Sequence, residues 1–311
     1  MLEEKSESAL EFDKNVTVVI PTLNEELGIA RVLEELLYLR LKNILVVDGY
    51  SSDKTVDIAK QFGARVVYQY GMGKTGAIKT AIQEVKTPYM LVMDGDFTYD
   101  ASCISRFLQH TASHDEIIGS RVSTANSMSH LHKFGNRMIS KIFNILMNTN
   151  ISDVCSGVYL LRTSSAKDLH LETDGFDVEA EIAAQIAAAG SITEVPVIYR
   201  QRLGKQKLST WRHGFTIVKT IVRLARSYNP GVFYSMVGGF LIIPASLMLF
   251  NSLIDWMFTG KIFSSWFFAG ISTLLVAVQS LSVGVLSLIM RRTELRIARR
   301  LKKLMPQGVS T

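Results

Sequence analysis

Cysteine is scarce in this sequence, and the amino-terminal residues lack a targeting pattern. Cys103 and Cys155 are the two cysteines among 311 residues, too few for a disulfide framework, so we expect both to be free thiols. The polar stretch 1–14 has the pattern of neither a signal peptide nor a transit peptide. No internal repeat or low-complexity segment is visible. Both cysteines fall in the part of the chain for which we expect a cytosolic location.

Charge is almost absent between residues 231 and 290, whereas the preceding residues have the composition of a soluble α/β protein. The apolar stretches 231–254 and 266–290 each exceed the roughly 20 residues needed to span a bilayer, so they predict a transmembrane hairpin. A buried hairpin of a soluble protein is the alternative. Because basic residues flank both outer ends, the positive-inside rule predicts a two-span protein of the cell membrane with its main domain and both termini in the cytosol.

The net charge of +6 does not by itself identify a partner. The basic excess lies beside the apolar stretches, which favours a lipid bilayer and argues against nucleic acid. Residues 211–228 carry a basic stripe next to an aromatic and apolar stripe, which is typical of a helix in the headgroup plane; an ordinary surface helix is the alternative. The predicted segments are a polar tail (1–14), an α/β domain (15–210), an interfacial helix (211–228), a transmembrane hairpin (229–290) and a basic cytosolic tail (291–311).

Apolar strand-like runs alternate with amphipathic helical segments through the α/β domain. The predicted strands are 16–20, 44–48, 65–69, 90–93, 116–121, 158–161 and 193–199. Between the first two strands, one helical face carries Ile29, Val32, Leu33, Leu36 and Leu37. This alternation predicts a doubly wound, mainly parallel sheet, in which ligands bind outside the carboxyl ends of the strands.

Two carboxylates follow the fourth predicted strand directly. Asp94 and Asp96 point their oxygens the same way, because side chains alternate along an extended backbone and Gly95 leaves room between them. Paired hard oxygens at an accessible strand end suit Mg²⁺ or Mn²⁺, with open positions left for phosphate oxygens. An ordinary Asp-Gly-Asp turn is the alternative.

A glycine-rich turn, 71–76, matches the dinucleotide-binding fingerprint but follows the third strand rather than the first. It is not a Walker loop either, because Tyr68 stands where the first glycine is required. We expect its backbone amides and Lys74 to approach a diphosphate at a helix start. His130 and His132 have no third partner in the sequence, so no metal site is expected there.

The chain resembles family 2 glycosyltransferases in six motifs that occur in the family's order. They are Pro21-Thr-Leu-Asn-Glu25, Val47-Asp-Gly-x-Ser-x-Asp-x-Thr55, Asp94-x-Asp96, Gly119-Ser-Arg121, Asp153-x-x-Ser-Gly157 and Arg202-x-Gly-x-x-Lys207-Leu208. The resemblance covers about residues 15–225 and is strongest to the dolichol-phosphate (polyprenyl-phosphate) mannose and glucose synthases. It implies a GT-A fold and a divalent metal that binds a nucleotide-diphospho-sugar.

The resemblance also implies roles for individual residues. Asp94 and Asp96 would hold the metal and, with Arg121 and Arg202, form the catalytic set. Donor-binding positions would be Pro21, Thr22, Leu23, Asn24, Glu25, Asp48, Ser51, Asp53, Lys74, Gly95 and Lys207. The acceptor phosphate would meet Arg121, Arg137, Ser140, Asp153 and Ser156. Asp153 is equally plausible as a base and as an orienting partner for an arginine.

Some positions depart from the family's pattern. Gly49 follows Asp48 where many members have a second aspartate, and Leu23 replaces a tyrosine common in mannose synthases. Thr98 stands where some members have glutamine near the metal, and Gln206 replaces a serine. These departures favour a UDP-sugar slightly, and UDP-glucose, UDP-N-acetylglucosamine and GDP-mannose all stay open.

The chemistry follows from the residue types. A lipid phosphate is largely ionised near neutral pH, so it can attack an anomeric carbon without a strong base, and direct displacement inverts that carbon. The metal and four cations, Arg121, Arg137, Arg202 and Lys207, would offset the charge of two phosphate-bearing reactants.

Three other functions are less well supported by the sequence. A processive polysaccharide synthase usually carries Gln-x-x-Arg-Trp, which is missing here. A catalytically inactive, lipid-presenting subunit would not need the Asp94-x-Asp96 pair. A channel is disfavoured by two spans without charge. Dolichyl or polyprenyl phosphate is the expected acceptor, and a homo-oligomer is left open.

Overall fold

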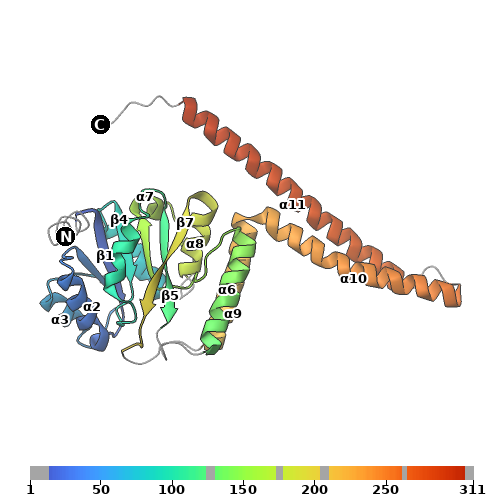
Figure 1. Cartoon of the computed structure of the whole chain (residues 1–311). Helices are drawn as coiled ribbons and strands as arrows, with labels where there is room; N and C mark the ends of the chain where they lie inside the picture. Colours follow the sequence, from blue (N-terminus) through green and yellow to red (C-terminus); the bar gives the residue numbers. More distant parts are fainter. Residues whose placement is uncertain (1–13, 124–129, 173–177, 204–209, 261–264, 305–311) are drawn as a thin grey trace. The chain divides into compact units, whose positions relative to one another are not determined.

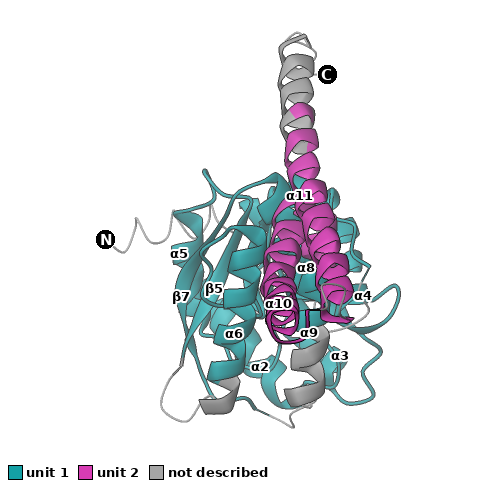
Figure 2. Ribbon diagram, turned by 90° about the vertical axis from the view of Figure 1, so that its right-hand side faces the viewer, with its two compact units in different colours: residues 1–222 teal, residues 223–311 magenta. Residues whose placement is uncertain are grey.

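The computed structural model describes residues 14–123, 130–172, 178–203, 210–260 and 265–304. These residues form two compact units that divide between Val222 and Arg223 (Figure 2). The predicted donor contact Lys207 lies outside the described residues. The division falls within the helix that the sequence predicts between the α/β domain and the hairpin.

Seven strands of the described chain form one sheet in the order β3-β2-β1-β4-β6-β5-β7 (Figure 1). Their bounds are β1 (Val16–Thr22), β2 (Ile44–Asp48), β3 (Arg65–Tyr68), β4 (Tyr89–Met93), β5 (Glu116–Ser123), β6 (Val158–Arg162) and β7 (Ile192–Tyr199). The neighbours β1–β2, β1–β4, β2–β3 and β5–β7 are parallel. The predicted doubly wound, mainly parallel architecture is confirmed.

The connections are helical, as the alternating pattern predicts. They are α2 (Glu26–Tyr38), α3 (Thr55–Gln61), α4 (Gly73–Glu84), η1 (Ala101–Cys103), α5 (Ile104–Leu108), α6 (His130–Met147), α7 (Thr163–Lys167) and α8 (Val178–Ala189). Helix α2 buries four of the five residues predicted for its apolar face; Leu37 is exposed instead. It is the last of the five, close to the end of the helix at Tyr38.

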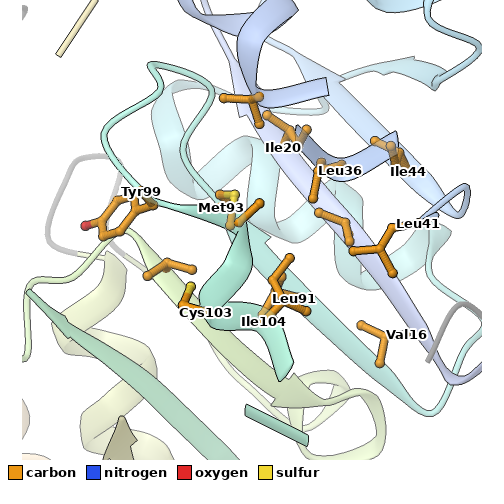
Figure 3. Packing of buried hydrophobic residues seen from close by; sticks show 14 of the residues in the cluster. Val16, Ile20, Leu36, Leu41, Ile44, Leu91, Met93, Tyr99, Cys103 and Ile104 are labelled. Atoms are coloured by element: carbon orange, nitrogen blue, oxygen red, sulfur yellow. The ribbon is translucent and has the colours of Figure 1, made fainter. Parts of the chain in front are cut away.

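The core lies where β1 and β4, at the centre of the sheet, meet α2 and η1. Figure 3 shows Val16, Ile20 and Leu91 from the strands in one cluster with Leu36 from α2 and Cys103 from η1. Burying a leucine or isoleucine fully stabilises the fold by about 1.5–3 kcal/mol, so this cluster holds the two central strands firmly. Burial raises the pKa of the Cys103 thiol to about 12. Both cysteines are free thiols, as expected.

The direction of β6 decides what surrounds the carboxyl end of β4. Strand β6 is antiparallel to both its neighbours, and its first residue, Val158, pairs with the last residue of β4, Met93. Gly157, just before β6, is therefore brought beside Asp94, just after β4. The sequence predicts the strand 158–161 but not its direction.

The second unit contains two long apolar helices, α10 (Pro230–Thr259) and α11 (Ser265–Leu304), which follow α9 (Thr210–Tyr228). Within the described residues, Pro230–Thr259 and Ser265–Met290 are long and apolar enough to cross a membrane. Figure 1 shows α10 and α11 side by side. The first part of the predicted basic tail continues α11 as far as Leu304.

Small residues at intervals of seven form the seam between α10 and α11. The buried positions are Gly231, Gly238, Ala245 and Ser252 on α10 and Gly270, Ala277 and Gly284 on α11. A Cβ atom added to Gly238 would lie 2.8 Å from the backbone oxygen of Ala277. Small residues let the two backbones approach closely, and a repeat of seven keeps the seam on one side of each helix.

Replacing Gly238 with leucine is therefore expected to destabilise the hairpin by about 1–3 kcal/mol through overpacking against backbone atoms. Gly239→Leu is the matched control, because nothing lies within 4 Å of a Cβ at Gly239. The measurement is denaturant unfolding of the full chain in detergent, followed by circular dichroism. Equal loss of stability in both variants would contradict the seam.

Candidate active site

The loops that follow β1 and β2 are held together by Asp48, the last residue of β2. Its carboxylate is fully buried and accepts hydrogen bonds from Thr22 Oγ1 at 3.2 Å, Ser51 N at 2.8 Å and Ser51 Oγ at 2.5 Å. Residues predicted to hold the nucleotide thus come together. The buried carboxylate of Asp48 holds the loop after β2 through its hydrogen bonds with Ser51. Its contact with the donor stays a prediction.

The loop 21–25 is fastened to the segment 51–55 by backbone and side-chain bonds. Asn24 N donates to Ser51 Oγ and Ser52 N donates to Asn24 Oδ1, both at 2.8 Å. Asp53 accepts a hydrogen bond from Glu26 N at 3.1 Å. Asn24 has a φ of +52°, a left-handed conformation that asparagine tolerates. These bonds shape the rim on which Leu23 is exposed.

The carboxylates of Asp94 and Asp96 stand at the carboxyl end of β4 among cationic partners. Asp94 Oδ1 lies 2.6 Å from Lys74 Nζ. Asp96 Oδ2 lies 3.4 Å from Arg202 Nη1, and Arg202 Nη2 lies 2.6 Å from Glu25 Oε1. The sequence placed all five residues in one site, and the structure brings them together.

Asp96 is the more enclosed of the two acids. Its Oδ1 accepts hydrogen bonds from Thr98 Oγ1 at 2.6 Å and Thr98 N at 3.1 Å. Burial, and next the negative charge of Asp94, raise the pKa of the Asp96 carboxyl. Two carboxylates that repel each other at a strand end match the donor set of a hard divalent cation. The described residues hold no group of three or more metal-ligating side chains, so phosphate or water oxygens would complete the shell.

Two glycines let other elements come close to these acids. A Cβ on Gly28, in the first turn of α2, would lie 2.7 Å from Gly95 O and 2.8 Å from Asp96 Cα. A Cβ on Gly157 would lie 1.9 Å from Asp94 Oδ2. At Gly28 the obstacle is backbone, whereas at Gly157 it is the end of a movable side chain.

We expect Gly157→Ala to displace the Asp94 carboxylate and weaken Mn²⁺ binding at least about tenfold, with little loss of stability because a side-chain tip can move. Gly135→Ala is the control, since a Cβ at Gly135 meets nothing within 4 Å. Mn²⁺ affinity from electron paramagnetic resonance and the melting temperature test this. Unchanged Mn²⁺ affinity in Gly157→Ala would show that the Asp94 position does not matter.

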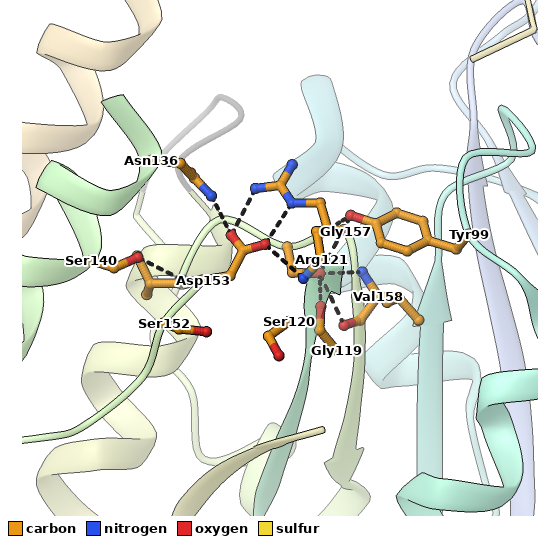
Figure 4. Close-up of polar contacts among 12 residues, drawn as sticks. Tyr99, Gly119, Ser120, Arg121, Asn136, Ser140, Ser152, Asp153, Gly157 and Val158 are labelled. Atoms are coloured by element: carbon orange, nitrogen blue, oxygen red, sulfur yellow. Dashed lines mark hydrogen bonds and ion pairs between the residues drawn. The ribbon is translucent and has the colours of Figure 1, made fainter. Parts of the chain in front are cut away.

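Arg121 and Asp153 form a bidentate ion pair beside β5 (Figure 4). Arg121 Nε and Nη2 donate to the two carboxylate oxygens at 2.6 and 2.7 Å, and Asn136 donates to the same carboxylate at 2.5 Å. Burial raises the pKa of the Asp153 carboxyl, but Arg121 outweighs burial, and the resulting pKa is lowered. Tyr199 supports the guanidinium from one side, its ring centroid 5.4 Å away. Asp153 is thus the ion-pair partner of Arg121, and its role in the reaction stays a prediction.

The other predicted acceptor residues lie differently. Ser140 and Ser156 are buried; Ser140 Oγ accepts from Val154 N at 3.2 Å, and Ser156 Oγ donates to Gly119 O at 2.5 Å. In this conformation each hydroxyl is hydrogen-bonded to a backbone group. Arg137 is exposed on α6. Contact of these three residues with an acceptor stays a prediction.

Two residues at the site were assigned no role from the sequence. Glu179, in the first turn of α8, lies 2.6 Å from Lys74 Nζ. Tyr99 accepts a hydrogen bond from Gly157 N at 2.7 Å. The signal for Glu179 is a carboxylate on a helix whose other residues are mainly apolar, as α8 is buried along most of its length. Tyr99 has no such signal, because a single tyrosine after the carboxylates would be interpreted as an ordinary residue of the hydrophobic core.

The chain is similar to known glycosyltransferases. The model of the family described as glycosyl transferase family 2 matches residues 17–169. Glycosyltransferase AglJ of Haloferax volcanii is 34% identical over 230 residues, covering 72% of this chain and 76% of the relative. The dolichyl-phosphate hexose transferase of the same organism is 31% identical over 218 residues, covering 68% of this chain and 94% of the relative.

Solved structures share the fold. Glucosyl-3-phosphoglycerate synthase from Mycobacterium tuberculosis, in complex with Mn²⁺, UDP-glucose and phosphoglyceric acid, superposes with a TM-score of 0.56 at 17% identity, covering 73% of this chain and 83% of that chain. The same enzyme with Mg²⁺ and UDP gives 0.57 at 16% identity, with the same coverage. At such low identity the likeness establishes the GT-A fold and nothing finer.

Proposed function

The chain belongs to glycosyl transferase family 2, and from this premise we propose that it moves a hexose or N-acetylhexosamine from a nucleotide-diphospho-sugar to dolichyl or polyprenyl phosphate with inversion. The observation that carries the proposal is the pair Asp94 and Asp96 at the end of β4, with the cations Lys74 and Arg202 in contact with them. A relative named a dolichyl-phosphate hexose transferase supports the lipid acceptor.

At the donor end, Asp94 and Asp96 would hold Mg²⁺ or Mn²⁺, which when bound supplies Lewis-acid stabilisation to the departing diphosphate. The loop 21–25 and the segment 51–55 would hold the nucleoside, since their mutual bonds fix the rim of the sheet there. Arg202 joins Glu25 to Asp96 and so connects the nucleoside rim with the metal-binding acids.

At the acceptor end, cationic groups would receive the lipid phosphate. Arg121 is held in one orientation by both oxygens of Asp153. Arg202 Nε is buried and has no hydrogen-bond partner among the described residues, which leaves one donor for an anionic oxygen. The lipid phosphate needs no strong base, because it is already largely ionised. Its oxygen forms a bond to the anomeric carbon as the bond from that carbon to the diphosphate oxygen breaks, which inverts the configuration.

The carboxyl-terminal helices suit a lipid substrate. We assign α10 and the apolar part of α11 as two membrane spans, and α9 as the interfacial helix that precedes them. With the basic residues outside the spans on the cytosolic side, the catalytic domain and both termini are cytosolic. Membrane spans suit an enzyme for polyprenyl phosphate, because the tail of that lipid lies in the bilayer and its head group at the interface.

The test is transfer by membranes containing the full chain. They are incubated with polyprenyl phosphate and, in turn, radiolabelled UDP-glucose, UDP-N-acetylglucosamine and GDP-mannose, and the lipid products are separated. One donor is expected to give a single lipid-phosphate sugar, and this product is not expected to form when EDTA is present. A water-soluble polymer would identify a processive synthase instead, and no transfer from any donor would leave an inactive lipid-presenting subunit.

A further inference from the structure

The ammonium of Lys74 contacts Asp94, the carboxylate that is predicted to bind the divalent metal. Its ammonium lies 2.6 Å from Asp94 Oδ1, and the lysine side chain is 10% exposed. The lysine comes from the first turn of α4, which contains no acidic residue. A positive charge there is disfavoured by the helix dipole, so it needs carboxylates from elsewhere in the fold.

Glu179 provides the second carboxylate. Its Oε1 also lies 2.6 Å from Lys74 Nζ, and the side chain of Glu179 is 8% exposed. One ammonium group is thus in contact with two carboxylates that come from different elements of the fold. The lysine is therefore a charged bridge that neutralises both acids, and separating it from either leaves a poorly solvated charge.

We propose that Lys74 is a tethered counter-cation that competes with the divalent metal for Asp94, and that Glu179 positions it there until a nucleotide diphosphate draws it away. This inference rests on the proposed donor chemistry. Lysine has a flexible four-carbon stem, so its ammonium can leave Asp94 for a phosphate oxygen while its backbone stays in α4.

The consequence is a coupling between metal and nucleotide. Without nucleotide, a metal at Asp94 has to displace Lys74 or share the carboxylate with a positive charge, so it binds weakly. With nucleotide, Lys74 gains phosphate oxygens and Asp94 is released to the metal. Because coupling is reciprocal, the metal tightens nucleotide binding by the same factor.

The experiment measures Mn²⁺ affinity of the full chain in detergent by electron paramagnetic resonance, with and without UDP or GDP. Wild type is expected to bind Mn²⁺ about tenfold or more tightly when the nucleotide is present, within the usual range of binding coupling. Lys74→Met is expected to bind Mn²⁺ alone about tenfold more tightly than wild type. Lys79→Met removes the same charge from an exposed position on the same helix and serves as the control.

A second variant guards against misfolding, because Lys74→Met leaves Glu179 buried without its partner. Lys74→Met combined with Glu179→Gln removes both buried charges, and melting temperatures report folding. The inference is overturned if the folded variants bind Mn²⁺ alone no more tightly than wild type. It is also overturned if wild type binds Mn²⁺ equally well with and without nucleotide, a measurement that needs no variant.

These outcomes are separate from those of the proposed function. The Mn²⁺ titrations require no lipid and no transfer, so the expected coupling together with failed transfer to every lipid would refute the acceptor and leave the role of Lys74 intact. Normal transfer without coupling between Mn²⁺ and nucleotide in wild type would support the acceptor and refute the role of Lys74.

Discussion

Replacing Asp94 or Asp96 with asparagine is expected to lower sugar transfer to polyprenyl phosphate on the order of 10³-fold. Asparagine keeps the size of the side chain and removes the charge that holds the cation, and each 1.36 kcal/mol of lost transition-state stabilisation costs a factor of ten. The measurement is the initial rate of lipid-linked product at excess lipid, together with Mn²⁺ affinity in the presence of nucleotide. Both quantities are expected to fall.

Asp57→Asn is the matched control for these variants, because Asp57 is an exposed aspartate on α3, the helix between β2 and β3. It is expected to transfer sugar at the wild-type rate. Transfer by wild type is also expected to stop in EDTA and to return with Mg²⁺ or Mn²⁺. Full activity of Asp94→Asn, or transfer unaffected by EDTA, would exclude the metal role of the carboxylates.

Breaking the Arg121–Asp153 pair is expected to have the largest effect on stability. Asp153→Asn leaves a buried guanidinium without its counter-charge, which typically costs about 3–5 kcal/mol. The pair Arg31–Glu34 is exposed, so Glu34→Gln is the control and is expected to cost about 0–1 kcal/mol. Denaturant unfolding at pH 7, followed by tryptophan fluorescence, measures both. Similar small losses in the two variants would contradict the importance of the buried pair.

The same pair predicts a pH dependence. The pKa of Asp153 is lowered in the folded chain because Arg121 outweighs burial. A carboxyl with a lowered folded pKa contributes stability that is present above its unfolded pKa, about 3.9, and is lost as the pH falls through the folded value. Wild type should therefore lose more stability than Asp153→Asn on acidification below about pH 4. Parallel acid curves for the two proteins would contradict this.

A double variant separates stability from catalysis. Arg121→Met combined with Asp153→Asn removes both charges, and replacing both partners of a buried pair is often nearly neutral for stability. We expect the double variant to recover part of the stability that Asp153→Asn loses, while transfer stays low because the acceptor phosphate has lost Arg121. Recovery of transfer along with stability would make Arg121 structural.

Local pattern was enough for the elements and for the position of two acids at the end of β4. The strand that ends at Met93 is an apolar run buried in the centre of the sheet, and the carboxylates of Asp94 and Asp96 adjoin it in sequence. The alternation of strands and helices predicts the mainly parallel sheet for the same reason, because burial on both faces requires continuous apolar runs. The interval of seven between small residues in α10 and α11 is likewise a property of the local sequence.

Contacts between distant segments were not predictable in this way. Lys74 and Glu179 are brought together by α4 and α8, and neither helix carries a sign of the other in its own sequence. The family resemblance implies that Ser140 and Ser156 meet a phosphate, yet both are buried and their hydroxyls are hydrogen-bonded to backbone groups.

The sequence alone determined that this chain is an α/β protein with two acids at a strand end, followed in sequence by two apolar helices. Those properties depend on residues that are adjacent along the chain. Which groups surround the acids was decided by tertiary structure. The antiparallel course of β6 sets Gly157 against Asp94, and α8 brings Glu179 to Lys74. Strand direction and helix packing depend on burying the whole core at once, and no local pattern encodes them.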